Sequence, residues 1–147
     1  LVRAGAAVIN DEDSVTASHR PLRAFEFDAT HCPDLFPALA ALAAAAQGES
    51  VIRGTSRLEH KECNRADAIR EEYAKAGIEV DTSQEDVMRI RGGRIRAARV
   101  QSHGDHRMAM SMAVAGLLSD GEMTIEDAEC VAKSYPGFFE DLEKIRI

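Results

Sequence analysis

Two short charged clusters carry the residue types in this sequence that are best suited to chemistry on anions. They are Lys61-Glu62-Cys63-Asn64-Arg65 and Asp105-His106-Arg107, each placed where a helix is expected to begin. A helix N-terminus has unpaired N–H groups and partial positive charge, so it favours anions and disfavours added cations. If Lys61 and Arg65 share a helix face, they repel each other by about 0.2–0.5 kcal/mol. We therefore expect an anion between them, with Lys133 as a further cation; the alternative is that all of these cations are solvated at the surface.

Length, composition and charge narrow the class of protein. The 147 residues are 45% hydrophobic and 29% charged, which fits one globular domain that can bury a core. The net charge of −7 argues against nucleic acid or an anionic membrane as a partner, because both call for a basic face. The longest apolar stretch, residues 35–46, contains Pro37 and is shorter than the roughly 20 residues that cross a bilayer, so no membrane segment is expected.

The cysteines indicate the compartment. Cys32, Cys63 and Cys130 are odd in number, widely separated and form no C-x-x-C pair, and no secretory signal opens the chain. These features predict a reducing, cytoplasmic location. The His and Cys residues have no tetrahedral ligand spacing, so we expect no metal.

Turn residues and apolar spacing predict the elements that position the first cluster. Gly48 and Gly77 are helix stop signals. Ile69, Tyr73 and Ala76 have the spacing of one buried helix face. The expected elements are a helix at about 35–47 that Pro33-Asp34 leads into, a strand at 50–54, a helix from about 61 to 76, and strands at 78–80 and 87–91.

The same order of signals returns about 70 residues later, which we interpret as duplication of a βαβαββ unit inside one domain. Asp105, Gly121 and Lys133 correspond to Asp34, Gly48 and Lys61 of the first unit. The expected elements of the second unit are a strand at 100–102, a helix at 106–118, a strand at 123–125 and a helix at 136–144.

The first residues predict the end of an earlier unit. Residues 1–6 have the pattern of a helix end with Gly5 as its cap, and short strands are expected at 7–9, 14–16 and 24–27. Because the chain begins without Met, we expect a piece of a longer protein.

The helices at 35–47 and 106–118 are apolar on nearly every side past the first turn, as expected of helices surrounded by sheet. We therefore predict an α/β (α+β) fold with its helices packed inside sheets. The methionines Met108, Met110 and Met112 are expected to be core residues and not a metal or cofactor site. The last helix is expected to bury Phe138, Phe139, Leu142 and Ile145.

Four ordered motifs carry a resemblance to a known family. They are Pro33-Asp34-Leu35-Phe36-Pro37-Ala38-Leu39-Ala40, Lys61-Glu62-x-x-Arg65, Asp105-His106-Arg107-Met108-Ala109-Met110 and Lys133-Ser134-Tyr135-Pro136-x-Phe138-Phe139. Over nearly the whole chain they resemble the 5-enolpyruvylshikimate-3-phosphate synthase (EPSP synthase) family, and as a set they are specific although each alone is weak.

The resemblance implies a two-domain transferase built from six βαβαββ units, with the active site in the cleft between the domains. Residues 1–147 would be the C-terminal part of one enolpyruvyl transferase domain. Within it, residues 24–99 and 100–147 would be two units, and residues 1–23 would end a preceding unit.

The implied reaction moves the enolpyruvyl group of phosphoenolpyruvate to the 5-hydroxyl of shikimate 3-phosphate and releases phosphate, in the shikimate pathway to aromatic amino acids. By resemblance, Arg65, Arg107 and Lys133 bind phosphoenolpyruvate, and Arg forks suit its phosphate and carboxylate. Lys61 would lie between the two substrates, help hold shikimate 3-phosphate and stabilise the tetrahedral intermediate. No cofactor is implied, and the family suggests a monomer.

The proton transfers call for two carboxylates in different surroundings. By resemblance, Asp34 would take the proton of the 5-hydroxyl and help hold shikimate 3-phosphate, Glu62 would exchange a proton with the methylene carbon, and His106 would donate a hydrogen bond. The structural alternatives are an ordinary helix cap for Asp34, a first-turn acid for Glu62 and a purely structural His106.

The sequence departs from the family pattern around the first cluster. Cys63-Asn64 stand where Ser or Thr followed by Asp is commoner, and Glu59-His60 where a basic residue is commoner. The change at Asn64 puts an ion pair to Arg65 in doubt, and an exposed Cys63 would be open to oxidation whereas a buried thiol is inert. The family's N-terminal Lys-Ser, its Gly-rich segment and the Arg of its partner domain have no counterpart, so we expect this chain to be inactive without the missing portion of the protein.

Two other functions stay open. A related transferase that acts on UDP-N-acetylglucosamine shares the fold, although the joint Lys-Glu-x-x-Arg and Asp-His-Arg motifs favour the shikimate enzyme. The second is a non-catalytic anion-binding or structural module, against which the carboxylates of Asp34 and Glu62 argue.

Overall fold

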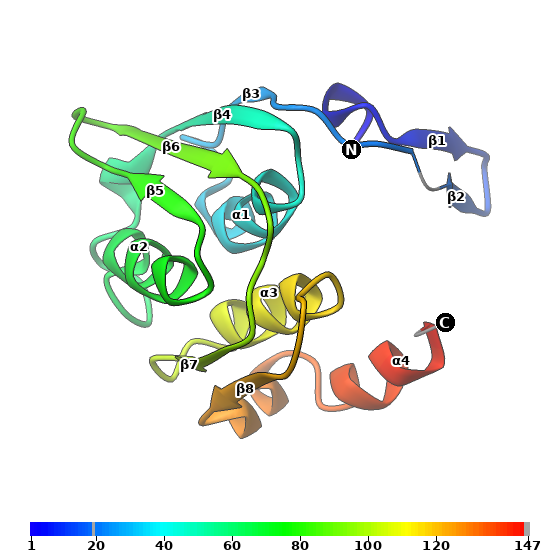
Figure 1. The fold of residues 1–147 in the computed structure, drawn as a ribbon. Coiled ribbons are helices and arrows are strands. Elements are labelled where there is room, and N and C mark those ends of the chain that lie inside the picture. The colour runs from blue at the N-terminus through cyan, green and yellow to red at the C-terminus, as the bar shows by residue number, and fades with distance from the viewer. Residues whose placement is uncertain (19, 146–147) are drawn as a thin grey trace.

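The structure is a computed structural model that describes residues 1–18 and 20–145. In it, helices lie between a four-stranded sheet and a two-stranded sheet (Figure 1). A short 3-10 helix, η1 (Val2–Ala4), ends at Gly5, whose φ of 89° is the left-handed conformation of a glycine cap. β1 (Ala7–Asn10) and β2 (Val15–Ser18) then form an antiparallel hairpin that extends away from the rest of the molecule. The predicted elements of residues 1–16 are confirmed.

Residues 26–92 contain a four-stranded sheet in the order β3-β4-β6-β5. Its outer strand β3 (Glu26–Asp28) runs parallel to β4 (Gly48–Arg53), and the two later strands are antiparallel to their neighbours. The other elements are η2 (Pro33–Leu35), α1 (Phe36–Ala44), η3 (Thr55–Arg57), α2 (Arg65–Lys75), β5 (Glu79–Asp81) and β6 (Val87–Gly92). The predicted strands and helices are present, but both helices begin later than predicted.

Residues 98–126 start with the same order of strand, helix and parallel strand as residues 26–53. β7 (Ala98–Gln101) runs parallel to β8 (Met123–Glu126), and α3 (His106–Gly116) connects them, as α1 connects β3 to β4. A 3-10 helix that the sequence did not predict, η4 (Ala128–Lys133), leads to α4 (Phe138–Ile145).

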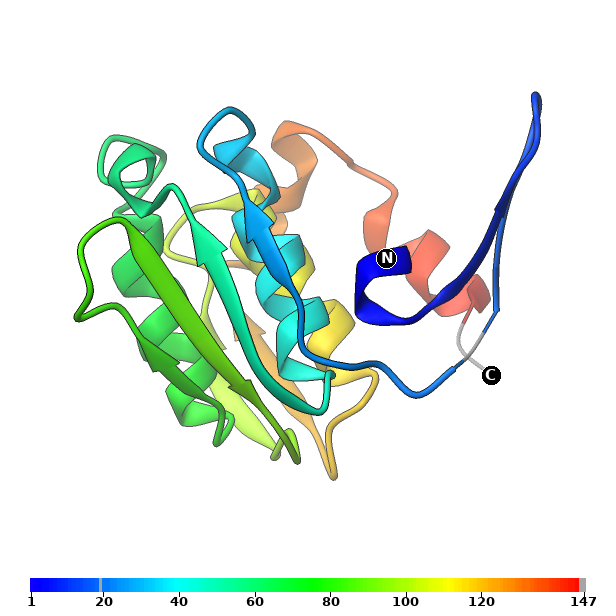
Figure 2. The ribbon, with the colours of Figure 1, turned by 90° about the horizontal axis from the view of Figure 1, so that it is seen from above.

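The core lies where α1 and α3 pack against each other, between the four-stranded sheet and the β7–β8 pair (Figures 1 and 2). Small side chains on α1 allow this close approach, and α3 fills the remaining space with Met108 and Met112, both fully buried. Met110 is half-buried, so the core prediction is confirmed for two of the three methionines. The α1–sheet contact is equally tight, because a Cβ at Gly92 would lie 2.5 Å from the carbonyl oxygen of Ala43 in α1.

The last helix differs from the prediction. None of the residues 138–145 of α4 is buried: Phe138, Phe139 and Leu142 are half-buried, and Ile145 is 68% exposed. Phe138 packs edge-on against Tyr135 and Phe139, with ring centroids 5.7 and 5.2 Å apart. The apolar spacing correctly predicts which face of the helix is apolar, but it does not specify what covers that face.

Among the described residues, no helix is both long and apolar enough to cross a membrane.

Candidate active site

The predicted site residues lie in connections that follow the carboxyl ends of parallel strands. Asp34 is in η2 after β3, Lys61 and Glu62 are in the loop after β4 and η3, and Asp105 follows β7. Lys133 ends η4, which follows β8. Figure 2 shows η2, η3 and η4, coloured blue, teal and orange, at one end of the molecule. The βαβ order therefore brings residues as far apart in the sequence as Asp34 and Lys133 to one end of the fold.

Arg65 occupies the centre of this group. Its side chain is 0% exposed, and three carboxylates bond it among the described residues. Nε donates to Asp105 Oδ2 at 2.8 Å, Nη1 to Asp34 Oδ1 at 2.9 Å and Nη2 to Glu62 Oε2 at 2.7 Å. Burial disfavours the charged guanidinium, but the hydrogen bonds that it donates to Asp105 and Asp34 outweigh burial and raise the pKa of Arg65. Arg65 is therefore a fixed positive charge.

Asp34 is the carboxylate on which the cations converge. Besides Arg65, its Oδ1 lies 3.2 Å from Lys61 Nζ, and its Oδ2 lies 3.5 Å from Arg107 Nη2. The hydrogen bond from Arg65, supported by Lys61 and Arg107, holds the pKa of Asp34 below its usual value although partial burial acts in the opposite direction. The prediction of an anion between Lys61 and Arg65 is confirmed, and in this structure the anion is Asp34.

The reason given for that anion was wrong. α2 begins at Arg65 and not around Lys61, because Asn64 is its N-cap and accepts a hydrogen bond from the Asp67 amide. Lys61 lies in the preceding loop, so the two cations do not share a helix face. Asp34 likewise does not cap α1, whose N-cap is Leu35, and this removes the ordinary cap as its alternative role.

The departures at residues 63 and 64 leave Arg65 well paired. Asn64 serves α2 as a cap, while Asp105, which the sequence analysis did not place beside Arg65, supplies a buried ion pair. Cys63 is half-buried with Sγ 3.8 Å from Asp105 Oδ2. Burial, together with the Asp105 charge, raises the pKa of Cys63 to about 11, so its sulfur is a thiol and not a thiolate at neutral pH.

His106 and Arg107 form the first turn of α3, which Asp105 caps by accepting a hydrogen bond from the Arg107 amide at 2.9 Å. His106 is buried, and its Nδ1 has no hydrogen-bond partner within residues 1–18 and 20–145. A buried imidazole nitrogen without a partner is costly, which favours a role in binding over a purely structural one.

Lys133 lies apart from the Asp34 group. Its Nζ donates to the Gly104 carbonyl oxygen at 2.9 Å, at the loop before α3. The structure therefore joins Lys61, Arg65 and Arg107 through Asp34, and attaches Lys133 to the neighbouring loop.

An open hollow of about 250 Å³ lies beside the charged group. Asp34 and Arg107 line it together with apolar side chains of α1 and α3, including Ala38, Met110 and Val114. It places a charged edge next to an apolar floor, which suits a small ligand that carries both anionic groups and a carbon skeleton.

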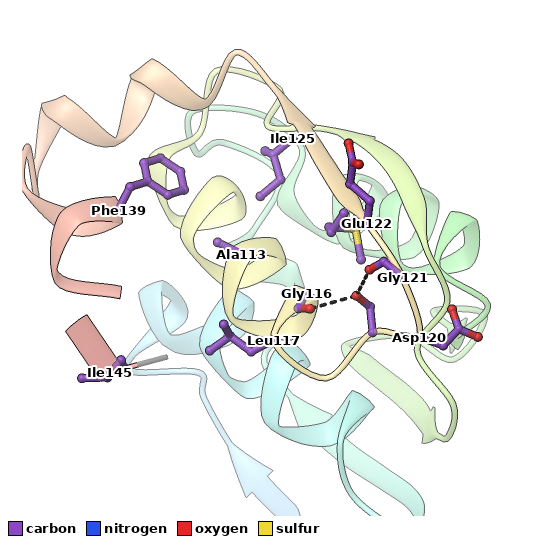
Figure 3. Close-up of a pocket in the computed structure, with 11 residues that line it drawn as sticks. Ala113, Gly116, Leu117, Asp120, Gly121, Glu122, Ile125, Phe139 and Ile145 are labelled. Carbon is purple, nitrogen blue, oxygen red and sulfur yellow. Dashed lines mark hydrogen bonds between the residues drawn. The ribbon is translucent and has the colours of Figure 1, made fainter. Parts of the chain in front are cut away.

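A larger hollow of about 940 Å³ lies between α3, β8 and α4 (Figure 3). Ala113, Leu117, Ile125 and Phe139 contribute apolar side chains to it. Among the described residues, those that line it include none of the predicted site residues. The chemistry predicted from the sequence is therefore not in this larger hollow.

The side chains of Glu62, Asp105 and His106 offer possible metal ligands within 4.8 Å of one another. Both carboxylates already bond Arg65, however, and a guanidinium in their midst repels a second cation. The donor set favours an arginine-centred site over a metal site.

Comparisons with known proteins agree on one family. The model of the family described as EPSP synthase (3-phosphoshikimate 1-carboxyvinyltransferase) matches residues 1–142. A protein of Methanocella arvoryzae named 3-phosphoshikimate 1-carboxyvinyltransferase is 43% identical over 147 residues, covering 99% of this chain and 35% of the relative. A protein of Thermococcus kodakarensis with the same name is 43% identical over 141 residues, covering 96% of this chain and 35% of its own.

Solved structures show the same likeness. An EPSP synthase from Acinetobacter baumannii matches with a TM-score of 0.83 and 32% identity, over 98% of this chain and 37% of its own. The enolpyruvyl transferase NikO from Streptomyces tendae matches with a TM-score of 0.75 and 27% identity, over 98% of this chain and 33% of its own. The chain thus spans about a third of the length of the relatives it matches.

Proposed function

Because this chain belongs to the EPSP synthase family, we propose that the protein containing it transfers the enolpyruvyl group of phosphoenolpyruvate to the 5-hydroxyl of shikimate 3-phosphate. The observation that carries the proposal is the convergence of Lys61, Arg65 and Arg107 on the single carboxylate of Asp34. Three cations around one acid are suited to an anionic substrate and to a base that must sit beside it.

In this proposal the chain supplies one face of the active site, and polypeptide outside residues 1–147 supplies the rest. The relatives are about three times as long as the chain, and the net charge of −7 leaves only a few local cations to hold two substrates that carry phosphate and carboxylate groups. We propose that the protein acts as a cytoplasmic monomer and needs no cofactor.

Asp34 acts as an internal anion until substrate binds. Five N–H groups are available on Arg65, and carboxylates within the described residues take three of them. The Asp34 side chain is 49% exposed, so it can turn away when the anionic groups of phosphoenolpyruvate reach Lys61, Arg65 and Arg107. Lys133 reaches the same substrate from the adjacent loop by giving up the Gly104 carbonyl.

Displacement of Asp34 prepares it as the base. Loss of the hydrogen bonds from Arg65 and Lys61 raises its pKa back toward the usual range, and its oxygen is free to take the proton of the 5-hydroxyl. The hydroxyl oxygen then bonds to C2 of phosphoenolpyruvate while Glu62, which is open to solvent, passes a proton from water to the methylene carbon. Lys61 stabilises the tetrahedral intermediate and helps hold shikimate 3-phosphate, and His106 donates a hydrogen bond within the site.

The second half of the reaction removes a proton from the carbon that was protonated in the first half. Glu62 takes a proton back from the new methyl group, the C2–O bond to phosphate breaks, and phosphate leaves with the electron pair. Glu62 is 36% exposed and bonds Arg65, so it lies at the solvent side of the charged group, where a small movement suffices for both transfers.

The test is phosphate release from shikimate 3-phosphate plus phosphoenolpyruvate, measured on this chain and on a full-length protein containing it. A chimaera in which this chain replaces the matching 35% of the Methanocella arvoryzae relative serves the same purpose. We expect release by the full-length protein and none by the chain alone. Turnover by the purified chain would overturn the proposal that it is one face of a larger site.

A parallel assay with UDP-N-acetylglucosamine as acceptor distinguishes the proposed function from the related transfer to that acceptor. Preference for that acceptor would replace the substrate but keep the chemistry. Absence of release with either acceptor, with phosphoenolpyruvate still bound, would reduce the site to a non-catalytic anion-binding module.

A further inference from the structure

A buried carboxylate outside the predicted site lies beneath the loop that carries Asp105. Glu72, in the third turn of α2, is 1% exposed, yet four contacts satisfy its carboxylate. Lys75 Nζ donates to both oxygens at 2.9 and 2.7 Å, the Gln101 amide donates to Oε2 at 2.9 Å, and His103 Nε2 lies 2.7 Å from Oε1. Two of these partners, Gln101 and His103, belong to the segment 101–105, which runs from the last residue of β7 to the N-cap of α3.

Glu72 and Arg65 make α2 a two-point attachment for that segment. The two residues are seven positions apart, so they lie on one face of α2 about 10 Å apart along its axis. At the first point Arg65 bonds the Asp105 carboxylate, and at the second Glu72 bonds the Gln101 amide and the His103 ring. α2 offers a positive charge at the first point and a negative charge at the second. A shift of the segment along the helix would therefore mismatch both contacts.

The segment has a strained conformation that needs such support. His103 has a φ of 54°, in the left-handed region that residues other than glycine seldom adopt. The contact of its ring with Glu72 offsets that cost. Buried Ser102 also fastens the segment, since its hydroxyl donates to the Asp127 carbonyl and accepts from the Gly104 amide, both at 3.1 Å.

We propose that Glu72 and His103 are positioning residues, which hold the segment 101–105 on α2 so that Asp105 and Arg107 meet Arg65 and Asp34 at the right place. This inference rests on the proposed function for its kinetic consequence but not for the contact itself. Neither residue touches the reacting groups, so both act through Asp105 and the first turn of α3. A displacement of about 1 Å in such a site costs about 100-fold in rate.

The first experiment replaces Glu72 in the full-length protein. Glu72→Gln keeps the shape and an acceptor for the Gln101 amide but loses the charge that holds Lys75 and His103. We expect kcat to fall at least tenfold, with a smaller change in the KM for shikimate 3-phosphate. The control is Glu85→Gln, an exposed acid just before β6 that lies outside the Glu72–His103 cluster and should leave kcat unchanged.

The second experiment separates positioning from backbone strain at His103. His103→Gly removes the ring but relieves the positive φ, so an exclusively structural role predicts a protein that is at least as stable and as active. His103→Gln keeps an N–H donor of similar reach. We expect His103→Gly to lower kcat at least tenfold without lowering the unfolding midpoint, and His103→Gln to recover most of the loss; equal activity of the two variants would overturn the proposal.

Amide hydrogen exchange distinguishes failure of this inference from failure of the proposed function. In Glu72→Gln we expect faster exchange of the Gln101, Asp105 and Arg107 amides, with little change in β4. If the unchanged protein shows no transferase activity, the proposed function fails. The exchange pattern still tests whether Glu72 holds the segment 101–105 on α2. Exchange at segment 101–105 equal to that of the unchanged protein would overturn it.

Discussion

The Nε atom of Arg65 and the Oδ2 atom of Asp105 lie 2.8 Å apart, and both side chains are completely excluded from solvent. The pair joins the first residue of α2 to the N-cap of α3 across 40 positions of sequence. Because Asp34 and Glu62 bond the remaining two nitrogens, Arg65 fixes the positions of both carboxylates proposed for proton transfer.

Replacement of Asp105 tests the stabilising role of this pair. Asp105→Asn can still cap α3 but leaves the buried guanidinium without one counter-charge, so we expect a loss of about 3–5 kcal/mol in the free energy of unfolding, measured with urea. Asp105→Ala should cost about 1 kcal/mol more, since the cap is lost as well. The control, Glu85→Gln, changes an exposed acid and should stay within about 0.5 kcal/mol. A loss below about 1 kcal/mol in Asp105→Asn would contradict a stabilising role for the pair.

Asp34→Asn in the full-length enzyme tests the two roles proposed for Asp34, as an anion that pairs with the cations before substrate binds and as the base. Removal of the proposed base should lower kcat by about 10²–10⁴-fold. The KM for phosphoenolpyruvate should fall or stay the same, because the amide no longer competes as an anion for Lys61 and Arg107. Steady-state kinetics give both values, with Asp81→Asn on β5, at the opposite edge of the sheet from β3, as the control. An unchanged kcat would remove Asp34 from the proton transfer.

Alkylation of Cys63 tests its protonation state. Since burial and Asp105 raise its pKa from 9.0 to about 11, the thiolate fraction near pH 8 is about 100-fold lower than in the unfolded chain. Labelling of the Cys63 peptide by iodoacetamide, measured by mass spectrometry, should be slower by a similar factor in the folded protein. Labelling at the unfolded rate would show that the thiol is neither buried nor close to Asp105.

Unfolding at several pH values tests the ionisation of Glu72. Burial acts to raise its pKa, but the hydrogen bonds from Lys75, the Gln101 amide and His103 outweigh burial and place the pKa below the ordinary value of 4.5. The folded state therefore binds fewer protons than the unfolded state just below pH 4.5, and the stability due to Glu72 is present above that pH and lost as the pH falls. The stability difference between the unchanged protein and Glu72→Gln should be constant above about pH 5 and should shrink below pH 4.5. A difference that does not depend on pH would mean that Glu72 is not ionised when folded.

Much of the fold and part of the site followed from the sequence. Local signals set the elements: Gly5 and Gly77 end helices with positive φ, Asp105 caps α3, and the spacing of Ile69 and Tyr73 marks the buried face of α2. These features depend on contacts within a few residues, which a linear pattern records. The four ordered motifs also predicted the family, which the comparisons confirm.

The tertiary structure decided which charges meet. The sequence predicted an anion near Lys61 and Arg65 but assigned it through a shared helix face, whereas the loop before α2 and the η2 turn bring Asp34 to them. It likewise did not predict that Asp105 pairs with buried Arg65 or that His103 pairs with buried Glu72, partners that lie 40 and 31 positions away. Pairings over such distances depend on how βαβ units pack, and an apolar or charged pattern specifies a face without its partner. The apolar face of α4, which is only half-buried at Phe138, Phe139 and Leu142, shows the same limit.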